Sequence, residues 1–260
     1  MEQKAERLRQ LHFGPRILVL PNAWDVASAR IFERAGFPAI ATTSAGVAFS
    51  LGYPDGDRIS RKEMVEAVAR IARAVKVPVT ADVEAGYGDA VETARAVWAA
   101  GGVGMNLEDT EGAGLVDMVP RVRAIRAATP EMVINARTDI FLNAIGEEGT
   151  RFERAVERLN AYRSAGADCL FAPGVRDRET IDRLVQAVRG PLNILATAGS
   201  PPIAEMQAMG VARISVGSGP MRATLGLTER IARELREQGT YAAMLDGAMG
   251  YSEANGLLGE

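Results

Sequence analysis

The sequence predicts a (β/α)₈ barrel, an α/β fold in which eight parallel strands alternate with helices. Short runs rich in β-branched residues alternate with longer amphipathic stretches, and eight such runs occur along the chain. The length of 260 residues also suits one barrel. The predicted strands are residues 17–20, 39–43, 78–83, 103–107, 132–136, 169–172, 192–196 and 213–216.

Capping patterns predict where several helices begin and end. Ser60, Asp89 and Thr150 each stand three residues before a glutamate, the spacing of a capping box that satisfies free amide groups. Pro201 and Pro202 favour another helix start, because the missing N–H of proline costs least there. Glycines, which adopt a left-handed conformation cheaply, mark helix ends at positions 36, 101, 166 and 210.

No linker-like stretch divides the chain, so residues 1–260 are expected to form one barrel domain. Residues 1–14 are predicted to hold an N-terminal helix, and residues from about 228 to 260 are predicted to hold C-terminal helices and a tail. The competing fold is a doubly wound open sheet. That fold often carries a glycine-rich phosphate loop after its first strand, and Pro-Asn-Ala-Trp-Asp at 21–25 is not such a loop.

Composition limits the function classes. The chain is 47% hydrophobic and 24% charged, with a net charge of −3, which gives no reason to propose nucleic acid or an anionic membrane as partner. The single cysteine, Cys169, excludes an intramolecular disulfide and is expected to be a buried apolar residue. The single histidine, His12, is expected on the surface of the N-terminal helix, and it excludes a multi-histidine metal site. A cytoplasmic location is expected, because no leader or membrane-spanning apolar run is apparent.

Carboxylates follow two neighbouring predicted strands, at the barrel end where active sites lie. Asp82 and Glu84 are two residues apart, so on a strand their side chains would point to the same side, and Glu108 ends the next strand. Such carboxylates repel one another unless a cation or a shared proton intervenes, and Mg²⁺ prefers oxygen ligands. We therefore predict a metal site at Asp82, Glu84 and Glu108. The alternative is that these acids cap helices or pair with arginines.

Other polar or small residues are expected at the same barrel end. Arg137 would aim its fork of donors at a carboxylate or an enolate oxygen, or it would neutralise the acidic cluster. A stretch of small residues would let backbone amides hold a carboxylate, namely Thr43, Ser44, Ala45 and Gly46. Asp55 lies in a turn and, on local grounds, is a plain turn aspartate. The glycine-rich residues 111–115 form either a mobile lid or an ordinary loop.

The chain resembles the isocitrate lyase/phosphoenolpyruvate mutase superfamily over nearly its whole length. The resemblance rests on Pro-Asn-Ala-Trp-Asp at 21–25, Thr-Ser-Ala-Gly-Val at 43–47, Gly-Tyr-Pro-Asp at 52–55, Ala-Asp-Val-Glu-Ala-Gly-Tyr-Gly at 81–88, Leu-Glu-Asp at 107–109 and Ala-Arg-Thr-Asp at 136–139.

The resemblance implies a barrel whose last helix is exchanged between subunits, in a homodimer or homotetramer. It implies Mg²⁺ (or Mn²⁺) near the three predicted acids and a 2-oxo acid substrate bound by Asp82, Arg137 and the backbone at residues 43–46. Asp55 and Arg137 would be the catalytic residues, with Asp55 near the reacting centre. The chemistry implied is the making or consuming of a pyruvate enolate through cleavage of a C–C or P–C bond.

Departures from the superfamily pattern leave the reaction open. Residues 111–115 lack the lid cysteine of the lyases and the lid lysine and asparagine of the P–C enzymes, and Glu84 stands where an aspartate is usual. We expect a Mg²⁺-dependent C–C lyase or decarboxylase that acts on a small 2-oxo or 2-hydroxy dicarboxylate. The alternatives are a P–C bond enzyme and a protein that binds a 2-oxo acid with little turnover.

Overall fold

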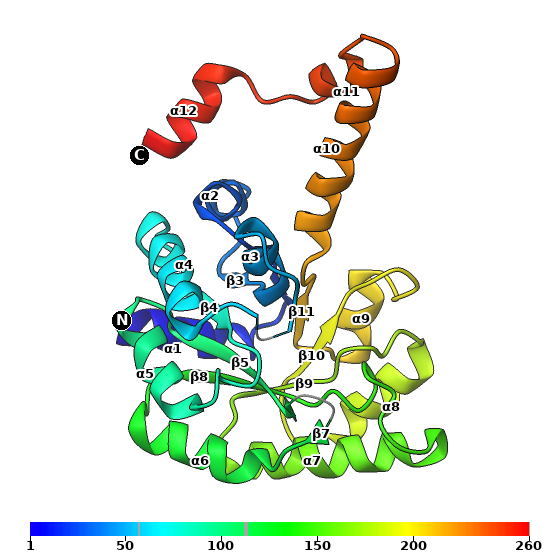
Figure 1. Cartoon of the computed structure of the whole chain (residues 1–260). Helices are drawn as coiled ribbons and strands as arrows, with labels where there is room; N and C mark the ends of the chain where they lie inside the picture. Colours follow the sequence, from blue (N-terminus) through cyan, green and yellow to red (C-terminus); the bar gives the residue numbers. More distant parts are fainter. Residues whose placement is uncertain (57, 112–113, 260) are drawn as a thin grey trace.

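The computed structural model describes residues 1–56, 58–111 and 114–259 (Figure 1). Its main sheet consists of parallel segments in the order β1-β11-β10-β9-β8-β5-β4-β3-β2. The segments are β1 (Leu18–Leu20), β2 (Asn22–Ala23), β3 (Ile40–Thr42), β4 (Val79–Asp82), β5 (Gly104–Glu108), β8 (Val133–Arg137), β9 (Cys169–Phe171), β10 (Leu192–Leu195) and β11 (Arg213–Ser215).

The sheet closes through its first strand. β1 and β2 are two halves of one strand separated by Pro21, which lacks the N–H that a continuous ladder requires. β1 pairs with β11 and β2 pairs with β3, so the two ends of the sheet meet in this strand. The eight predicted strands are therefore all confirmed, and the fold is the (β/α)₈ barrel that they predict.

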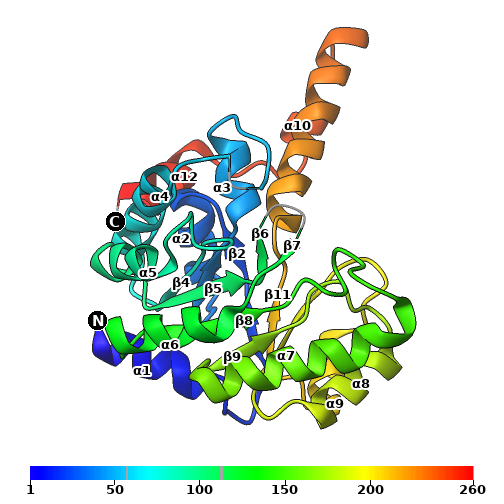
Figure 2. The same cartoon turned by 60° about the horizontal axis from the view of Figure 1, so that its bottom comes forward.

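Helices surround the sheet (Figures 1 and 2). The helices are α1 (Glu2–Leu11), α2 (Val26–Arg34), α3 (Ser44–Ser50), α4 (Arg61–Ala74), α5 (Ala90–Ala99), α6 (Met118–Ala128), α7 (Arg151–Ala165), α8 (Arg178–Ala187), α9 (Ile203–Met209), α10 (Gly219–Glu237), α11 (Ala242–Leu245) and α12 (Tyr251–Gly259). A short 3₁₀ turn, η1 (Glu148–Thr150), precedes α7, and an antiparallel pair, β6 (Thr110–Glu111) with β7 (Gly114–Leu115), follows β5. No helix in the described part of the chain has both the length and the apolar character needed to cross a membrane.

Two of the three predicted capping residues cap their helices. The Ser60 hydroxyl accepts a hydrogen bond from the Glu63 amide at 3.2 Å, and the Glu63 carboxylate accepts one from the Ser60 amide at 2.9 Å. Asp89 accepts from the amides of Val91 and Glu92. Thr150 is a wrong prediction: it has helical torsion angles within η1, and its hydroxyl donates to the Glu147 carbonyl at 3.0 Å instead of capping α7.

The C-terminal helices extend away from the barrel (Figure 1). α10 already begins at Gly219, and the chain then returns so that α12 lies against α2. Arg30 donates to the Leu257 carbonyl at 3.0 Å, and Arg34 forms an ion pair with Glu253 at 3.0 Å. Apolar side chains of α10 remain exposed, among them Leu225 at 48% and Leu235 at 49%.

His12 is buried, which corrects the expectation of a surface residue. α1 lies against the sheet, with Ala5 and Leu8 fully buried, and His12 is one helical turn after Leu8 on the same face. Its Nδ1 lies 2.8 Å from the Leu8 carbonyl. Burial, together with the neighbouring charge of Arg213, lowers the pKa of His12 to about 4.

This buried histidine should make the fold less stable as the pH falls. Because the folded pKa is depressed, the unfolded chain binds a proton more readily, so the stability present above the unfolded pKa of 6.5 is lost as the pH falls toward about 4. We expect His12→Asn to remove about 2 kcal/mol of the difference in unfolding free energy between pH 7 and pH 5. Urea unfolding of both proteins at the two pH values measures this, and identical pH slopes would show that His12 is not the group responsible.

Candidate active site

The strand register brings Asp82, Glu108 and Arg137 to one end of the barrel interior. Asp82 pairs with Asn106, two residues before Glu108, and Glu108 pairs with Arg137 on β8. Residues paired in this way on parallel strands point to the same face of the sheet. The carboxyl ends of β4, β5 and β8 therefore present three charged side chains to one mouth, where barrel active sites lie.

Asp82 is held by the residue that begins α3. Its Oδ2 accepts hydrogen bonds from the Ser44 amide at 3.0 Å and the Ser44 hydroxyl at 2.9 Å. Among the described residues, the hydrogen bonds to this carboxylate use Oδ2 alone, so Oδ1 is left to accept from a ligand. Two donors on one oxygen fix the orientation of the carboxylate.

The other small residues of this segment build the helix start. The Thr43 side chain caps α3 by accepting from the Gly46 amide at 3.3 Å. A Cβ atom at Gly46 would lie only 2.4 Å from Thr43 Cγ2, so close packing explains this glycine. Ser44 and Ala45 are buried in the first turn. All four predicted residues thus form the start of α3, and Ser44 contacts Asp82 directly.

Arg137 is paired with two carboxylates. Its Nη1 lies 2.9 Å from Glu108 Oε2, and Asp139 takes the other side of the fork, with Nε–Oδ1 at 2.5 Å and Nη2–Oδ2 at 3.0 Å. Its guanidinium carbon lies 5.8 Å from the centre of the Phe171 ring. Burial by itself would lower the pKa of Arg137, but the charges of Glu108 and Asp139 outweigh that penalty and raise it. The arginine therefore stays charged and neutralises the acidic cluster, which is one of its two predicted roles.

Glu84 lies beyond the end of β4 at Asp82 and has a positive φ of 51°. Strand alternation therefore does not by itself align its side chain with Asp82, and its place among the metal ligands stays a prediction. Glu84 is buried, and its side chain accepts a 3.4 Å hydrogen bond from the Tyr87 hydroxyl. Within the described residues, no three acidic, histidine or cysteine side chains are grouped to hold a metal ion.

The turn after β4 is strained. Tyr87, like Glu84, has a φ of 51°, and Gly86 has a φ of 96° in a place where a Cβ would lie 2.8 Å from Ala90. Non-glycine residues in this region each cost roughly 1–3 kcal/mol and occur preferentially at functional sites. The strain therefore supports a site at the end of β4.

Asp55 lies on the exposed loop between α3 and α4, and its predicted role at the reacting centre stays a prediction. The predicted lid, residues 111–115, begins and ends in the β6–β7 pair, and its residues 112–113 lie outside the described part of the chain.

Several buried polar residues near the site were not singled out from the sequence. Asp139 and Asp109 are almost or fully buried at the ends of β8 and β5. Arg213 is fully buried below the mouth, and it donates to Asn106 Oδ1 at 3.1 Å, while its Nε and Nη1 have no hydrogen-bond partner among the described residues. Burial lowers the pKa of Arg213, and the charge of Asp82 partly opposes this effect. The sequence signal that could have identified these residues is a charged residue next to or within an apolar strand.

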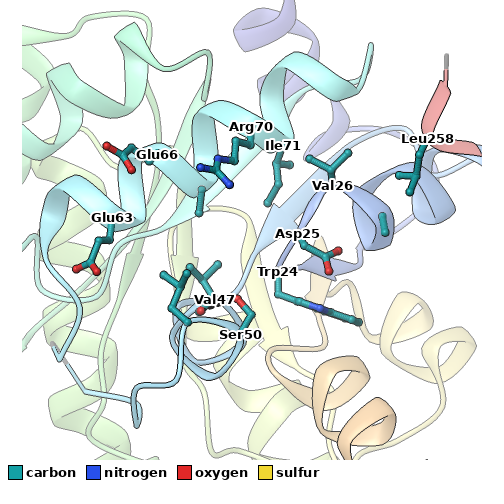
Figure 3. A pocket seen from close by; sticks show the side chains of 13 residues that line it. Trp24, Asp25, Val26, Val47, Ser50, Glu63, Glu66, Arg70, Ile71 and Leu258 are labelled. Atoms are coloured by element: carbon teal, nitrogen blue, oxygen red, sulfur yellow. Dashed lines mark hydrogen bonds between the residues drawn. The ribbon is translucent and has the colours of Figure 1, made fainter. Parts of the chain in front are cut away.

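A cavity of about 380 Å³ lies between α2, α3 and α4 (Figure 3). Trp24, Val47 and Ile71 contribute apolar surface, and Leu258 of α12 lies at its edge. None of the charged residues at the barrel mouth lines it. We therefore assign the candidate site to the barrel mouth, where opposite charges converge, and not to this cavity.

Comparison with known proteins gives a consistent result. The family model of phosphoenolpyruvate phosphomutase matches residues 8–236. The 2-methylisocitrate lyase of Aeropyrum pernix is 32% identical over 100% of this chain and 88% of its own length, and the 2,3-dimethylmalate lyase of Eubacterium barkeri is 30% identical over 98% and 94%. The structure of oxaloacetate acetylhydrolase in complex with the product oxalate superposes with a TM-score of 0.87 at 27% identity, covering 99% of this chain and 94% of that one.

Arg137 should contribute strongly to stability. Arg137→Met removes the guanidinium that bridges the carboxylates of Glu108 and Asp139 and leaves their buried negative charges uncompensated by it, so we expect the free energy of unfolding to fall by about 3–5 kcal/mol. Urea denaturation monitored by circular dichroism measures this. The control is Arg178→Met, which removes an exposed ion pair with Glu205 and should cost less than about 1 kcal/mol. Equal losses for the two variants would show that the site arginine is not buried in an ion cluster.

Proposed function

The chain belongs to the phosphoenolpyruvate phosphomutase family of the isocitrate lyase/phosphoenolpyruvate mutase superfamily, and on that premise we propose that it is a Mg²⁺-dependent lyase. The substrate class is a small 2-oxo or 2-hydroxy dicarboxylate, in which a C–C bond is cleaved. The observation that carries the proposal is the convergence of Asp82, Glu108 and Arg137 at one barrel mouth. Two of the relatives named above, 2-methylisocitrate lyase and 2,3-dimethylmalate lyase, are lyases, which supports the same reaction class.

The acidic residues suit Mg²⁺ as cofactor. We assign its protein ligands to Asp82 and Glu108, because a hard cation that retains several waters needs only one or two carboxylates. Glu84, whose side chain follows a left-handed turn, is assigned to the surrounding hydrogen-bond network. Mn²⁺ prefers similar oxygen ligands and would fit the same donors. When bound, the ion would polarise a substrate oxygen and stabilise the negative charge that develops on it.

The chain's own residues orient the substrate. The Ser44 amide and hydroxyl hold Asp82 in a fixed direction, and the first turn of α3 places the Ala45 backbone beside it. Arg137 is proposed to turn one edge of its guanidinium from Glu108 to a substrate carboxylate or enolate oxygen, while Asp139 holds the other edge. Charge stabilisation of this kind is usually the largest contribution to catalysis.

Asp55 is proposed to act at the reacting centre from the loop that follows α3. α3 contacts Asp82 through Ser44, so a movement of this loop would also shift the carboxylate of Asp82. An aspartate that reaches the mouth would hold or move a proton there.

The activity assay distinguishes the candidate functions. We expect Mg²⁺-dependent release of pyruvate or a related 2-oxo acid from a panel of oxaloacetate, 2-alkylmalates and methylisocitrate, and no activity after chelation of the metal. Asp82→Ala should abolish Mg²⁺ binding in calorimetry, because it removes the best-oriented ligand. The control is Asp177→Asn, which retains a good cap for α8. Phosphate release from phosphonopyruvate alone would favour the P–C alternative, and binding without turnover would favour a 2-oxo acid binding protein.

We also propose that α10 joins copies of this chain into a homo-oligomer. Its exposed leucines are an apolar surface that a second subunit would cover. Leu225→Glu combined with Leu235→Glu should lower the molar mass in light scattering to that of a monomer. Ile203→Glu changes a similarly exposed residue on α9 and should leave the mass unchanged. A monomeric wild-type protein, or a double variant that keeps the larger mass, would contradict the assignment.

A further inference from the structure

Asp109 links the outer helix α7 to the barrel mouth. It directly follows Glu108, the last residue of β5, and its side chain is fully buried beneath α7, whose Arg158 and Tyr162 it contacts. Its Oδ2 accepts from Arg158 Nε and from the Tyr162 hydroxyl, each at 2.7 Å. Its Oδ1 accepts from the Asp139 amide at 2.9 Å. One carboxylate therefore joins two α7 side chains to the end of β8.

The two α7 residues make this buried carboxylate tolerable. Arg158 supplies the compensating positive charge, without which an ionised group in this position would be very costly. Burial, and then the charge of Asp109, raise the pKa of Tyr162, so its hydroxyl keeps the proton that it donates. The Arg158 guanidinium also lies 5.7 Å from the centre of the Tyr162 ring.

The same contacts continue to the site arginine. Asp139, whose amide is held by Asp109, binds Arg137 through both carboxylate oxygens, and Arg137 pairs with Glu108. Glu108 and Asp109 are consecutive in sequence. The contacts from Asp109 through Asp139 and Arg137 therefore lead back to Glu108, next to Asp109 in the chain. A shift of Asp109 would move the backbone of Asp139. The Asp139 carboxylate, which orients Arg137, would move with it.

Arg158 also contacts the residues on both sides of the β6–β7 pair. Besides Asp109, it contacts the Val116 carbonyl through Nη2 at 2.5 Å, and the Val116 amide donates to the Asp109 carbonyl at 2.8 Å. Asp109 and Val116 flank this segment on either side. The same guanidinium therefore holds both of its ends next to the mouth.

We propose that Arg158 and Tyr162 are positioning residues that set the orientation of Arg137 through the buried carboxylate of Asp109. They touch no reacting atom; their effect on turnover rests on the proposed function, in which Arg137 binds the substrate, whereas the link itself is a property of the protein alone.

Hydrogen exchange of the unliganded protein tests the link. In Arg158→Gln, and more mildly in Tyr162→Phe, the peptide covering 137–141 should exchange about ten- to hundredfold faster, the factor expected when a hydrogen bond to a charged group is lost. Peptides of β3 and β4 should be unchanged. The matched control is Arg154→Gln, one turn earlier on α7, at a residue for which the described part of the chain shows no hydrogen bond or ion pair. Exchange at 137–141 equal to that of the control in both variants would overturn the proposal.

Steady-state kinetics give the second measurement. We expect kcat/KM to fall about tenfold in Arg158→Gln through loss of a charge-assisted bond, with partial rescue in Arg158→Lys, and to stay within about twofold for Arg154→Gln. Accelerated exchange with unchanged kcat/KM would also overturn a positioning role. If the wild-type protein turns over no substrate of the panel, the proposed function fails, and the exchange result still decides whether α7 positions Arg137.

Discussion

The ion pair between Glu108 and Arg137 is the contact on which the organisation of the barrel mouth depends. It follows from the register of β5 and β8, which sets the two residues opposite each other. With Asp139 on its other edge, the guanidinium faces two carboxylates, and Asp82 adds a third acid at the same end of the barrel. Three acids and Arg137 thus meet at this end of the barrel, with the buried Arg213 below them.

The residues around this ion pair restrict how it can rearrange. Ser44 fixes Asp82, and the α7 contacts to Asp109 fix the backbone from which Asp139 reaches Arg137. The Asp139 edge of the guanidinium is held by two hydrogen bonds, and the Asp139 amide is held in turn by Asp109. A ligand that displaced Arg137 from Asp139 would therefore disturb the contacts with α7 as well.

Sequence reasoning succeeded where a local pattern and the fold determine the same outcome. Strand periodicity predicted the barrel, and the rule that active sites lie at strand ends then predicted a common mouth for Asp82, Glu108 and Arg137. It failed for His12, whose neighbours come from elsewhere in the chain: it is buried because α1 lies against the sheet. It also failed for Thr150, because a local 3₁₀ turn precedes α7 and the spacing of a capping box does not reveal such a turn.

The sequence by itself determined the (β/α)₈ fold, the superfamily and the acids and arginine of the mouth, because alternation along strands and short-range motifs encode them. Only the tertiary structure decided which of these charges meet. The pairing of Arg137 with Glu108 and Asp139, and the burial of Asp109 beneath Arg158 and Tyr162, join segments far apart in the chain. Such contacts depend on strand register and helix packing, which no local pattern specifies.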